Sequence, residues 1–341
     1  MTRLASIHDV AKYAGVSSAT VSKVLNNYPN ISEQTRSKVD AAIEHLMYRP
    51  NVVARGLAKK RSWTIGIFLN NSFTNPFVAE LLLGAKQSLA NSGYDLIYLS
   101  MILNDPSYCF IRHCHSRNVD GILVFGIDKD NPQLRELVSH ELPSMFIDTE
   151  LLGRRAGYIT ADNQNGIIAA VAHLVELGHR NIAFISGEFG YVAGRGRFEG
   201  YQQGLRKFGL PYYTNYIEFG HFTKDGGYAA MRSILQLPER PTAVICTSDL
   251  MAIGAINAIH DYGLQVPNDM SVIGFDDTAY AQIVKPSLTT VNQNIPSIGA
   301  RAVRSLIEMI ETPDYSPPVL IEPVKLIIRE STSRRRGWDG Q

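Results

Sequence analysis

From residue 62 onward, this chain alternates short, near-continuous apolar runs with longer amphipathic stretches. The apolar runs lie at residues 64–70, 94–100, 121–127, 143–148, 181–186, 242–249 and 271–277. Runs of this length without polar alternation are typical of strands buried on both faces of a sheet. Stretches between them, at 77–91, 166–178 and 250–262, have helical spacing. The alternation therefore predicts an α/β body built on parallel sheets.

Polar or acidic residues directly follow several of the apolar runs. They are Asn70, Asn71, Asp148, Ser248, Asp249, Asp276 and Asp277. Ligands of open α/β sheets bind beyond the carboxyl ends of the strands, so these positions mark a candidate cleft. No GxGxxG follows the first strand and GxxxxGK(S/T) does not occur. The sequence therefore predicts no nucleotide cofactor.

The first 50 residues have a purely helical pattern. Ser6 and Asp9 have capping-box spacing, which predicts a helix from the residue after Ser6. Gly15 can end that helix in a left-handed turn, Ser17 can cap a second helix, and Ser32 can cap a third over about 33–47. The expected inward residues are Val10, Ala11, Ala14, Val21, Val24, Leu25, Val39, Ile43 and Leu46, and the expected outward residues are Ser18, Ala19, Ser22 and Lys23. Two short helices joined by a glycine turn predict a helix-turn-helix.

Charge is distributed unevenly along a chain whose formal net charge is only +1. Residues 1–61 hold ten Lys or Arg against four acids, a balance of +6, whereas the remainder carries −5. A basic segment on a mildly acidic body indicates nucleic-acid binding at one end. The alternative is a three-helix bundle with no nucleic-acid role.

Residues 52–58 form a short helical pattern interrupted by Gly56. Glycine inside a helix costs roughly 1 kcal/mol relative to alanine, and isolated helices of this length are marginal in water. We expect this segment to be disordered alone and to become helical only when another segment or molecule binds to it.

Three stretches together resemble one known family. HDVAKYAGVSSATVSKVLNN, ISEQTRSKVDAAIEHLMYRPNVVARGLAKKRSWTIGIFLN and SVIGFDDTAYAQIVKPSLTTVNQN resemble the lactose-repressor (LacI/GalR) family of bacterial transcription regulators, and the match runs from about Ile7 to Ser331. The resemblance implies a helix-turn-helix head (1–49), a hinge helix and linker (50–61), and an effector-binding and dimerisation body (62–341). The body would have two lobes folded like periplasmic binding proteins, one spanning about 62–161 plus 293–325 and the other about 162–292.

The resemblance also assigns DNA-contacting positions. Ser18, Ala19 and Lys23 fall at base-reading positions, and lysine can donate to guanine O6 and N7. Ser17 and Thr20 are better suited to phosphate contact or capping. The implied hinge contacts are Asn51, Val53, Ala54, Arg55 and Leu57, with Leu57 wedged into the minor groove. Val52 and Gly56 depart from the family's usual Ala and Ser, and we expect Gly56 to make hinge folding more dependent on DNA.

The resemblance also implies an effector cleft lined by Asn75, Phe77, Asp148, Arg197, Phe222, Ser248 and Asp276. Carboxylates accept paired hydroxyls, Arg donates to oxygen, and an aromatic ring covers an apolar sugar face, so the set suits a polyol. Some of these residues also have a simpler structural interpretation. Asp249 reads as a helix N-cap, Phe77 could be core, and Asp276-Asp277 could be a capping pair; Ser248 stands where some sugar-binding members have Asn.

Other features suggest no catalysis or metal binding. Cys109, His113, Cys114 and His115 lack the paired spacing of a zinc site, and no Ser/His/Asp constellation or GxSxG occurs, so we expect a non-enzyme. The last residues, with Arg334, Arg335 and Arg336, suggest a solvated end. They contain no apolar heptad repeat, so we expect a dimer rather than a tetramer held by a C-terminal helix. The sequence has no secretory signal, no apolar run approaching 18 residues and only three cysteines. We therefore expect a bacterial cytoplasmic, nucleoid-associated protein without a membrane partner.

These observations predict a dimeric repressor of a carbohydrate-utilisation operon. Two heads would bind the half-sites of a near-palindromic operator, and a sugar in the cleft would release the DNA. Two alternatives share the fold: a purine-type co-repressor arrangement, in which ligand strengthens DNA binding, and control by a protein partner. A solute-binding protein or enzyme with the same body fold is a further alternative.

Overall fold

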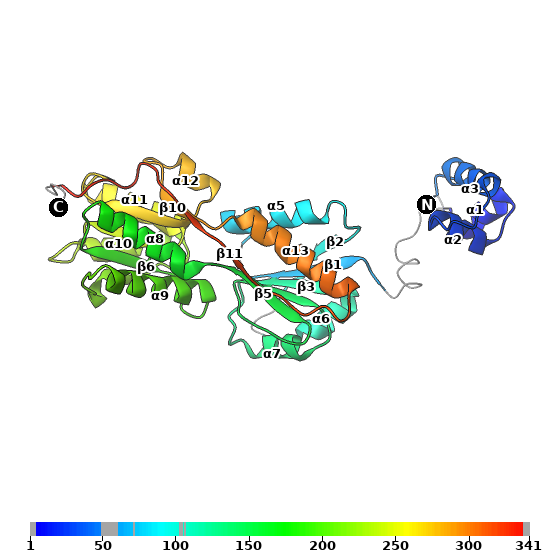
Figure 1. Ribbon diagram of the computed structural model, residues 1–341, viewed down its shortest axis with the longest axis horizontal. Helices are drawn as coiled ribbons and strands as arrows, with labels where there is room; N and C mark the ends of the chain where they lie inside the picture. The colour runs from blue at the N-terminus through cyan, green and yellow to red at the C-terminus, as the bar shows by residue number, and fades with distance from the viewer. Residues whose placement is uncertain (1–4, 49–60, 71, 102–104, 106, 337–341) are drawn as a thin grey trace. The chain divides into compact units, whose positions relative to one another are not determined.

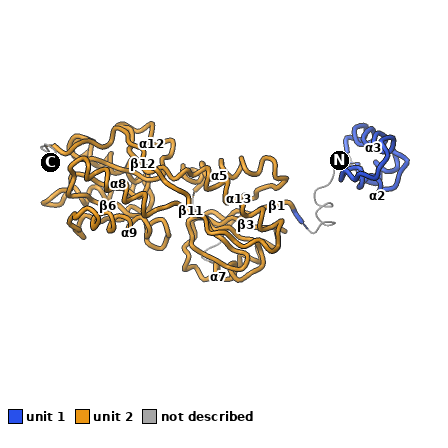
Figure 2. The backbone as a smooth tube through the Cα atoms, viewed as in Figure 1, with its two compact units in different colours: residues 1–62 blue, residues 63–341 orange. Residues whose placement is uncertain are grey.

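The computed structural model describes residues 5–48, 61–70, 72–101, 105 and 107–336, and it contains two compact units, 1–62 and 63–341 (Figure 2). We describe each unit by itself. No helix among the described residues has the length and apolar character needed to cross a bilayer.

The first unit consists of three helices: α1 (Ile7–Ala14), α2 (Ser18–Leu25) and α3 (Glu33–His45). The predicted capping box of α1 is present, and Gly15 ends the helix at φ 67°. Ser17 and Ser32 cap α2 and α3 as predicted. Helix α3 ends two residues before the expected Met47, because Met47 has a left-handed φ of 46° that does not continue a helix.

A small apolar core holds these helices together. Its buried members are Val10, Ala11, Val21, Val24, Val39 and Ala42, and the other predicted inward residues, Ala14, Leu25, Ile43 and Leu46, pack against them half-buried. The periodicity of the sequence therefore identified the inward face of each helix correctly.

The second unit has two lobes, each with a six-stranded sheet between two layers of helices (Figure 1). In the first lobe all strand pairs are parallel, with the order β11 (Val319–Glu322), β5 (Ala156–Ala161), β4 (Ser144–Ile147), β3 (Gly121–Phe125), β1 (Thr64–Leu69) and β2 (Asp95–Tyr98). One face is covered by α5 (Pro76–Leu89) and α13 (Ile295–Glu311), and the other by α6 (Phe110–Arg117) and α7 (Pro132–Ser139).

The second lobe repeats this plan with one exception. Its order is β12 (Lys325–Ile327), β10 (Thr289–Asn292), β9 (Ser271–Asp276), β8 (Ala243–Cys246), β6 (Ile182–Ser186) and β7 (Ile217–Phe219). Helices α10 (Lys224–Leu235) and α11 (Asp249–Asp261) cover one face, and α8 (Asn163–Glu176) and α9 (Val192–Lys207) the other. A short η1 (Thr214–Tyr216) and α12 (Ala279–Ile283) complete it. Strand β12 is antiparallel to β10, because the chain enters this sheet edge directly from β11.

All seven apolar runs form strands, so the predicted α/β body is confirmed. Five strands were not predicted: β5, β7, β10, β11 and β12. None of them has a long apolar run; β10 reads Thr-Thr-Val-Asn, and β7, β11 and β12 lie at sheet edges. The chain passes between the lobes after β5, after β10 and after β11, close to the boundaries expected at 161, 292 and 325.

The last described segment is anchored along the second lobe. Ser331 is buried and exchanges hydrogen bonds with Val272, and the Arg335 amide donates to the Leu177 carbonyl. The side chains of Arg334, Arg335 and Arg336 are exposed, as expected, although Arg336 pairs with Asp269 at 3.0 Å. This end is therefore solvated in its side chains but fixed in its backbone.

Candidate functional site

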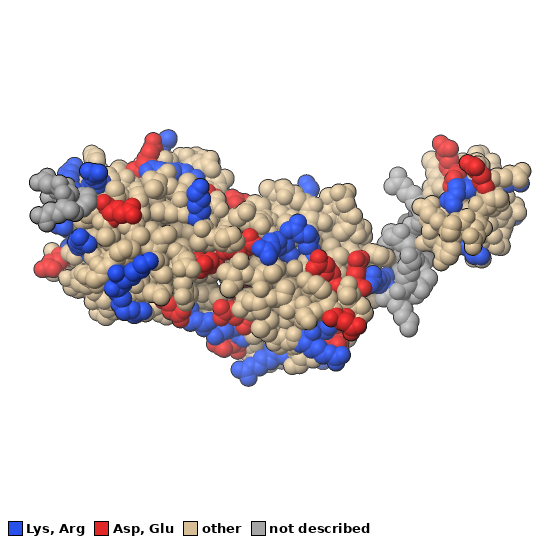
Figure 3. All heavy atoms as spheres, viewed as in Figure 1, with Lys and Arg blue, Asp and Glu red and all other residues tan. Residues whose placement is uncertain are grey.

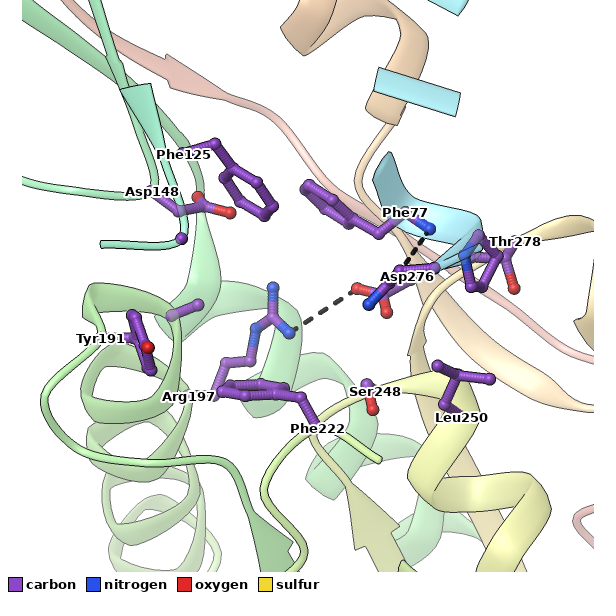
Figure 4. A pocket seen from close by; sticks show the side chains of 14 residues that line it. Phe77, Phe125, Asp148, Tyr191, Arg197, Phe222, Ser248, Leu250, Asp276 and Thr278 are labelled. Atoms are coloured by element: carbon purple, nitrogen blue, oxygen red, sulfur yellow. Dashed lines mark hydrogen bonds and ion pairs between the residues drawn. The ribbon is translucent and has the colours of Figure 1, made fainter. Parts of the chain in front are cut away.

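One pocket of the second unit is lined by side chains from both lobes (Figure 4). All seven residues of the predicted effector cleft lie in it. The full lining is Asn75, Pro76, Phe77, Phe125, Gly126, Asp148, Tyr191, Ala193, Arg197, Phe222, Ser248, Leu250, Asp276 and Thr278. The structure thus brings the predicted set together, and its role in effector binding stays a prediction.

Strand ends and helix N-termini position these side chains. Asp148 follows β4 and Asp276 is the last residue of β9, so both lie at carboxyl ends of strands, where α/β sheets place ligands. Asn75 and Ser248 are the N-caps of α5 and α11, and their side-chain oxygens accept hydrogen bonds from Phe77 N (2.9 Å) and Met251 N (3.3 Å).

Arg197 projects from α9 to the pocket with 2% of its surface exposed. Its Nε donates to Asn163 Oδ1 (2.7 Å) and its Nη1 donates to the Thr247 carbonyl (2.6 Å). The same Nη1 lies 3.7 Å from Asp276 Oδ1, and the guanidinium carbon lies 3.7 Å above the Phe275 ring. Burial lowers the pKa of Arg197, whereas Asp276, Asp148 and Asp249 raise it, and a guanidinium remains charged in proteins.

The two acidic residues of the pocket are held by different partners. Asp148 accepts a hydrogen bond from Thr160 Oγ1 (2.7 Å) and Asp276 accepts one from Gln293 Nε2 (2.6 Å). Desolvation by burial raises the pKa of both carboxyls, and Arg197 opposes the increase.

Three non-glycine residues of the pocket have positive φ angles: Asp148 (53°), Phe222 (55°) and Asp276 (123°). Non-glycine residues in this region are strained and cluster at ligand sites. The backbone geometry thus marks the same place as the side chains.

Aromatic rings form the apolar walls. Phe77 and Phe125 stack with centroids 5.0 Å apart on one side, while Phe222 and Tyr191 meet edge to face at 6.3 Å (Figure 4). A Cβ at Gly187 would come within 1.9 Å of the Phe222 ring, so only glycine leaves room for this ring position. Phe77 lines the pocket and also belongs to a buried apolar cluster of the first lobe, where its side chain is 8% exposed.

Two capping interpretations were wrong. Ser248, rather than Asp249, is the N-cap of α11. Asp249 is fully buried and accepts hydrogen bonds from Thr278 N (2.7 Å), Thr278 Oγ1 (3.0 Å) and Thr290 Oγ1 (2.6 Å). Asp276 and Asp277 do not cap α12 either; Asp277 pairs with Arg329 at 2.6 Å.

Sequence reasoning missed several lining residues, above all Phe125, Tyr191, Leu250 and Thr278. Phe125 lies near the end of the apolar run predicted at 121–127 and Leu250 comes two residues after Ser248, so their positions could have been read as neighbours of the cleft. Tyr191 is a loop residue before α9, and its local sequence carries no such signal.

The predicted DNA-contacting face of the first unit is accessible. Ser17, Ala19 and Lys23 are exposed, while Ser18 and Thr20 are half-buried. Ser18 Oγ lies 2.9 Å from His8 Nδ1, and Ser17 Oγ accepts from Thr20 N (3.1 Å). The face shown in Figure 3 has scattered charges of both signs on this unit. The hinge positions Asn51, Val53, Ala54, Arg55 and Leu57 lie outside the described residues.

The Cys109–His115 segment has ordinary structural roles. Cys109 caps α6, and Cys114 is buried in the first-lobe core. His113 lies 2.8 Å from the Tyr108 hydroxyl. Across the described ranges, no three His, Cys, Asp or Glu side chains group as a metal site would require.

Comparison with known proteins covers both units. Residues 6–51 match the model for bacterial regulatory proteins of the lacI family, and residues 171–332 match a periplasmic binding protein-like domain. Catabolite control protein A of Priestia megaterium is 35% identical over 96% of this chain and 99% of its own length.

Two solved structures share the fold. A lac repressor dimer bound to operator and the anti-inducer ONPF superposes with a TM-score of 0.83 at 28% identity, over 97% of this chain and all of its own. A complex of the transcriptional regulator CelR with cellobiose gives 0.71 at 31% identity, over 96% and 99%.

Proposed function

Because this chain belongs to the lacI family of bacterial regulatory proteins and is a DNA-binding transcriptional repressor, we propose that a sugar in its pocket releases it from the operator of carbohydrate-utilisation genes. It acts as a homodimer in the bacterial cytoplasm, at the nucleoid, without a cofactor. Its two heads bind the half-sites of a near-palindromic operator, since a two-fold protein matches two-fold DNA.

The observation that carries this proposal is the composition of the pocket. Two carboxylates, one Arg and opposed aromatic walls converge there from positions between 75 and 278. Carboxylates accept hydroxyl hydrogens, the guanidinium donates to oxygen, and rings cover the C–H faces of a sugar. CelR, a regulator with this fold, is bound to cellobiose in its solved complex.

The pocket also offers a route from ligand to DNA, since its walls belong to two lobes. Inter-lobe contacts flank it: Ala279 N donates to Glu80 Oε1 (3.1 Å), and Arg195 pairs with Glu150 (3.1 Å). A sugar that fits one arrangement of the lobes better than another shifts their equilibrium by its difference in affinity. That shift would reach the operator through the heads.

The test is fluorescence anisotropy of the full-length protein on its labelled operator while sugars are added. We expect one sugar to release the DNA, and the same sugar at about 100 times its dissociation constant to stabilise the body by roughly 2.7 kcal/mol. Tightening of the complex would support the co-repressor arrangement instead. An absence of any response to sugars or purines would favour a protein partner.

A further inference from the structure

The pocket has more acidic than basic side chains. Among the described residues that line it, Asp148 and Asp276 are acidic and Arg197 alone is basic. Asp249 lies behind Thr278, which lines the pocket and donates two hydrogen bonds to it, and so adds a third buried carboxyl nearby. A ligand in this pocket therefore meets a predominance of acidic groups.

Arg197 has little left for an anionic ligand. Two of its three nitrogens already donate inside the protein, and one of these also faces Asp276. Only Nη2 has no hydrogen-bond partner among the described residues. Strong recognition of phosphate or carboxylate uses two parallel N–H donors or several cations. Nη2 carries two N–H groups that suit hydroxyl or ring oxygens, but with Nε and Nη1 engaged it has no free neighbour with which to form a parallel pair.

The remaining hydrogen-bonding groups require a ligand that both donates and accepts. Asp148 and Asp276 each use one oxygen inside the protein, which leaves Oδ2 of each as an acceptor. The Asn75 amide nitrogen and the Ser248 hydroxyl hydrogen remain as donors, because the oxygens of both side chains accept from backbone N–H groups. Hydroxyls satisfy both kinds of group, whereas an ionised phosphate or carboxylate only accepts.

One feature favours anions, but it is weaker. Helices α5, α9 and α11 all begin at the pocket; Asn75 and Ser248 cap α5 and α11, whereas α9 has no side-chain cap. A helix N-terminus acts as about half a positive charge. Arg197 faces the carboxyls of both Asp276 and Asp148, and the caps Asn75 and Ser248 already accept from one backbone N–H each of α5 and α11. The hydrogen-bonding groups left free in the pocket therefore favour an uncharged ligand.

We propose, on the premise of the sugar-sensing function above, that the pocket selects uncharged sugars over sugar phosphates and sugar acids, and that Asp148 sets this selectivity. The proposal also implies a proton linkage. Burial already raises the pKa of the Asp148 carboxyl, and a bound anion would raise it further. Binding of an anionic sugar would therefore take up a proton and strengthen as the pH falls.

Calorimetric titration of the full-length protein with matched pairs tests the selectivity. The pairs are glucose with glucose 6-phosphate, glucose with glucuronate, and cellobiose with cellobiose 6-phosphate. We expect the uncharged member of any binding pair to bind at least tenfold more tightly. Equal or tighter binding of the charged member overturns the selectivity but leaves the sugar-sensing function intact. No binding by any mono- or disaccharide, charged or not, removes that function and this inference with it.

Asp148→Asn tests the residue. Asparagine keeps an oxygen to accept from Thr160, so the fold should survive, and a melting curve checks this. We expect the affinity ratio between uncharged and charged sugars to move at least tenfold toward the charged member. Asp261→Asn removes one charge at the opposite end of α11, about 18 Å along the helix from Asp249, and should leave the ratio unchanged. Equal losses for both sugars in Asp148→Asn would reduce Asp148 to a structural role.

A pH series on the unmodified protein gives a second readout that needs no variant. Affinity for glucose should vary less between pH 8 and pH 5.5 than affinity for glucuronate, whose carboxylate stays ionised over this range and whose affinity should increase as the pH falls. A charged sugar whose affinity stays constant over this range would contradict the proton linkage and the proposal.

Discussion

The helix-turn-helix unit and the pocket of the body differ in where their polar and charged side chains lie. The first unit buries six apolar side chains and exposes Ser17, Ala19 and Lys23 of its predicted DNA-contacting set. The pocket buries Asp148, Arg197 and Asp276, each less than a tenth exposed. Charged groups in the interior are tolerated only when they are paired and hydrogen-bonded.

The range of the hydrogen bonds differs in the same way. The caps of the first unit connect residues three apart, as between Ser17 and Thr20. Arg197 depends on partners 34 and 50 residues away. A DNA-reading surface can thus be specified locally, whereas a ligand pocket depends on distant segments that meet correctly.

The largest effect should come from Arg197→Ala. The change leaves Asp276 without its cation and Asn163 without its donor, and breaking a buried ion pair costs about 3–5 kcal/mol. Calorimetric melting should show this loss in the transition of the body, with operator binding by folded protein retained and the sugar response lost.

Arg195→Ala is the matched control on the same helix. Its ion pair with Glu150 is partly exposed, so the loss should stay below about 1 kcal/mol. If both variants lost the same stability, the contrast between buried and exposed pairs would fail.

Val21→Ala tests the small core of the first unit. Val21 is fully buried, and removing part of its side chain should destabilise this unit by about 2 kcal/mol through lost burial and a residual cavity. Operator affinity should fall while sugar affinity, measured by calorimetry, stays the same. A parallel fall in sugar affinity would show that the two regions are not energetically separate.

Lys23→Ala should alter recognition without altering stability. The side chain is exposed, so the unfolding free energy should stay within about 0.5 kcal/mol of the original. Selection from a randomised operator library should show a changed preference at one position per half-site, worth about 1–3 kcal/mol. Uniform weakening across all sequences would instead assign Lys23 to a phosphate.

A further effect concerns pH and the buried Asp249. Burial raises the pKa of its carboxyl from 3.8 to about 7, against the hydrogen bonds of Thr290 and Thr278. A carboxyl whose folded pKa is raised favours folding while protonated, so its contribution is lost as the pH rises from about 4 through 7. Asp148 and Asp276 act in the same direction.

Thr290→Val sharpens this prediction. It removes a hydrogen bond that stabilises the ionised carboxylate, so the upper limit of the pH window should move to higher pH. Urea unfolding of the body at several pH values measures the change. An unaltered profile would mean that Asp249 does not control this dependence.

Much of the architecture follows from local sequence. The alternation of apolar runs and amphipathic stretches predicted the α/β body, and Ser6, Gly15, Ser17 and Ser32 marked helix boundaries through bonds within four residues. Such features are readable because the interacting groups are neighbours in the chain. The cleft residues were obtained differently, by carrying them over from a family resemblance.

Only the tertiary structure decided the rest. It gave the capping role to Ser248 and placed Asp249 against Thr278 and Thr290, 29 and 41 residues further on. It brought Tyr191 into the pocket from a loop and fixed the last segment through Ser331 along the second lobe. Local sequence cannot specify these outcomes, because the order of strands within each sheet, rather than the order of residues in the chain, determines which polar groups become neighbours.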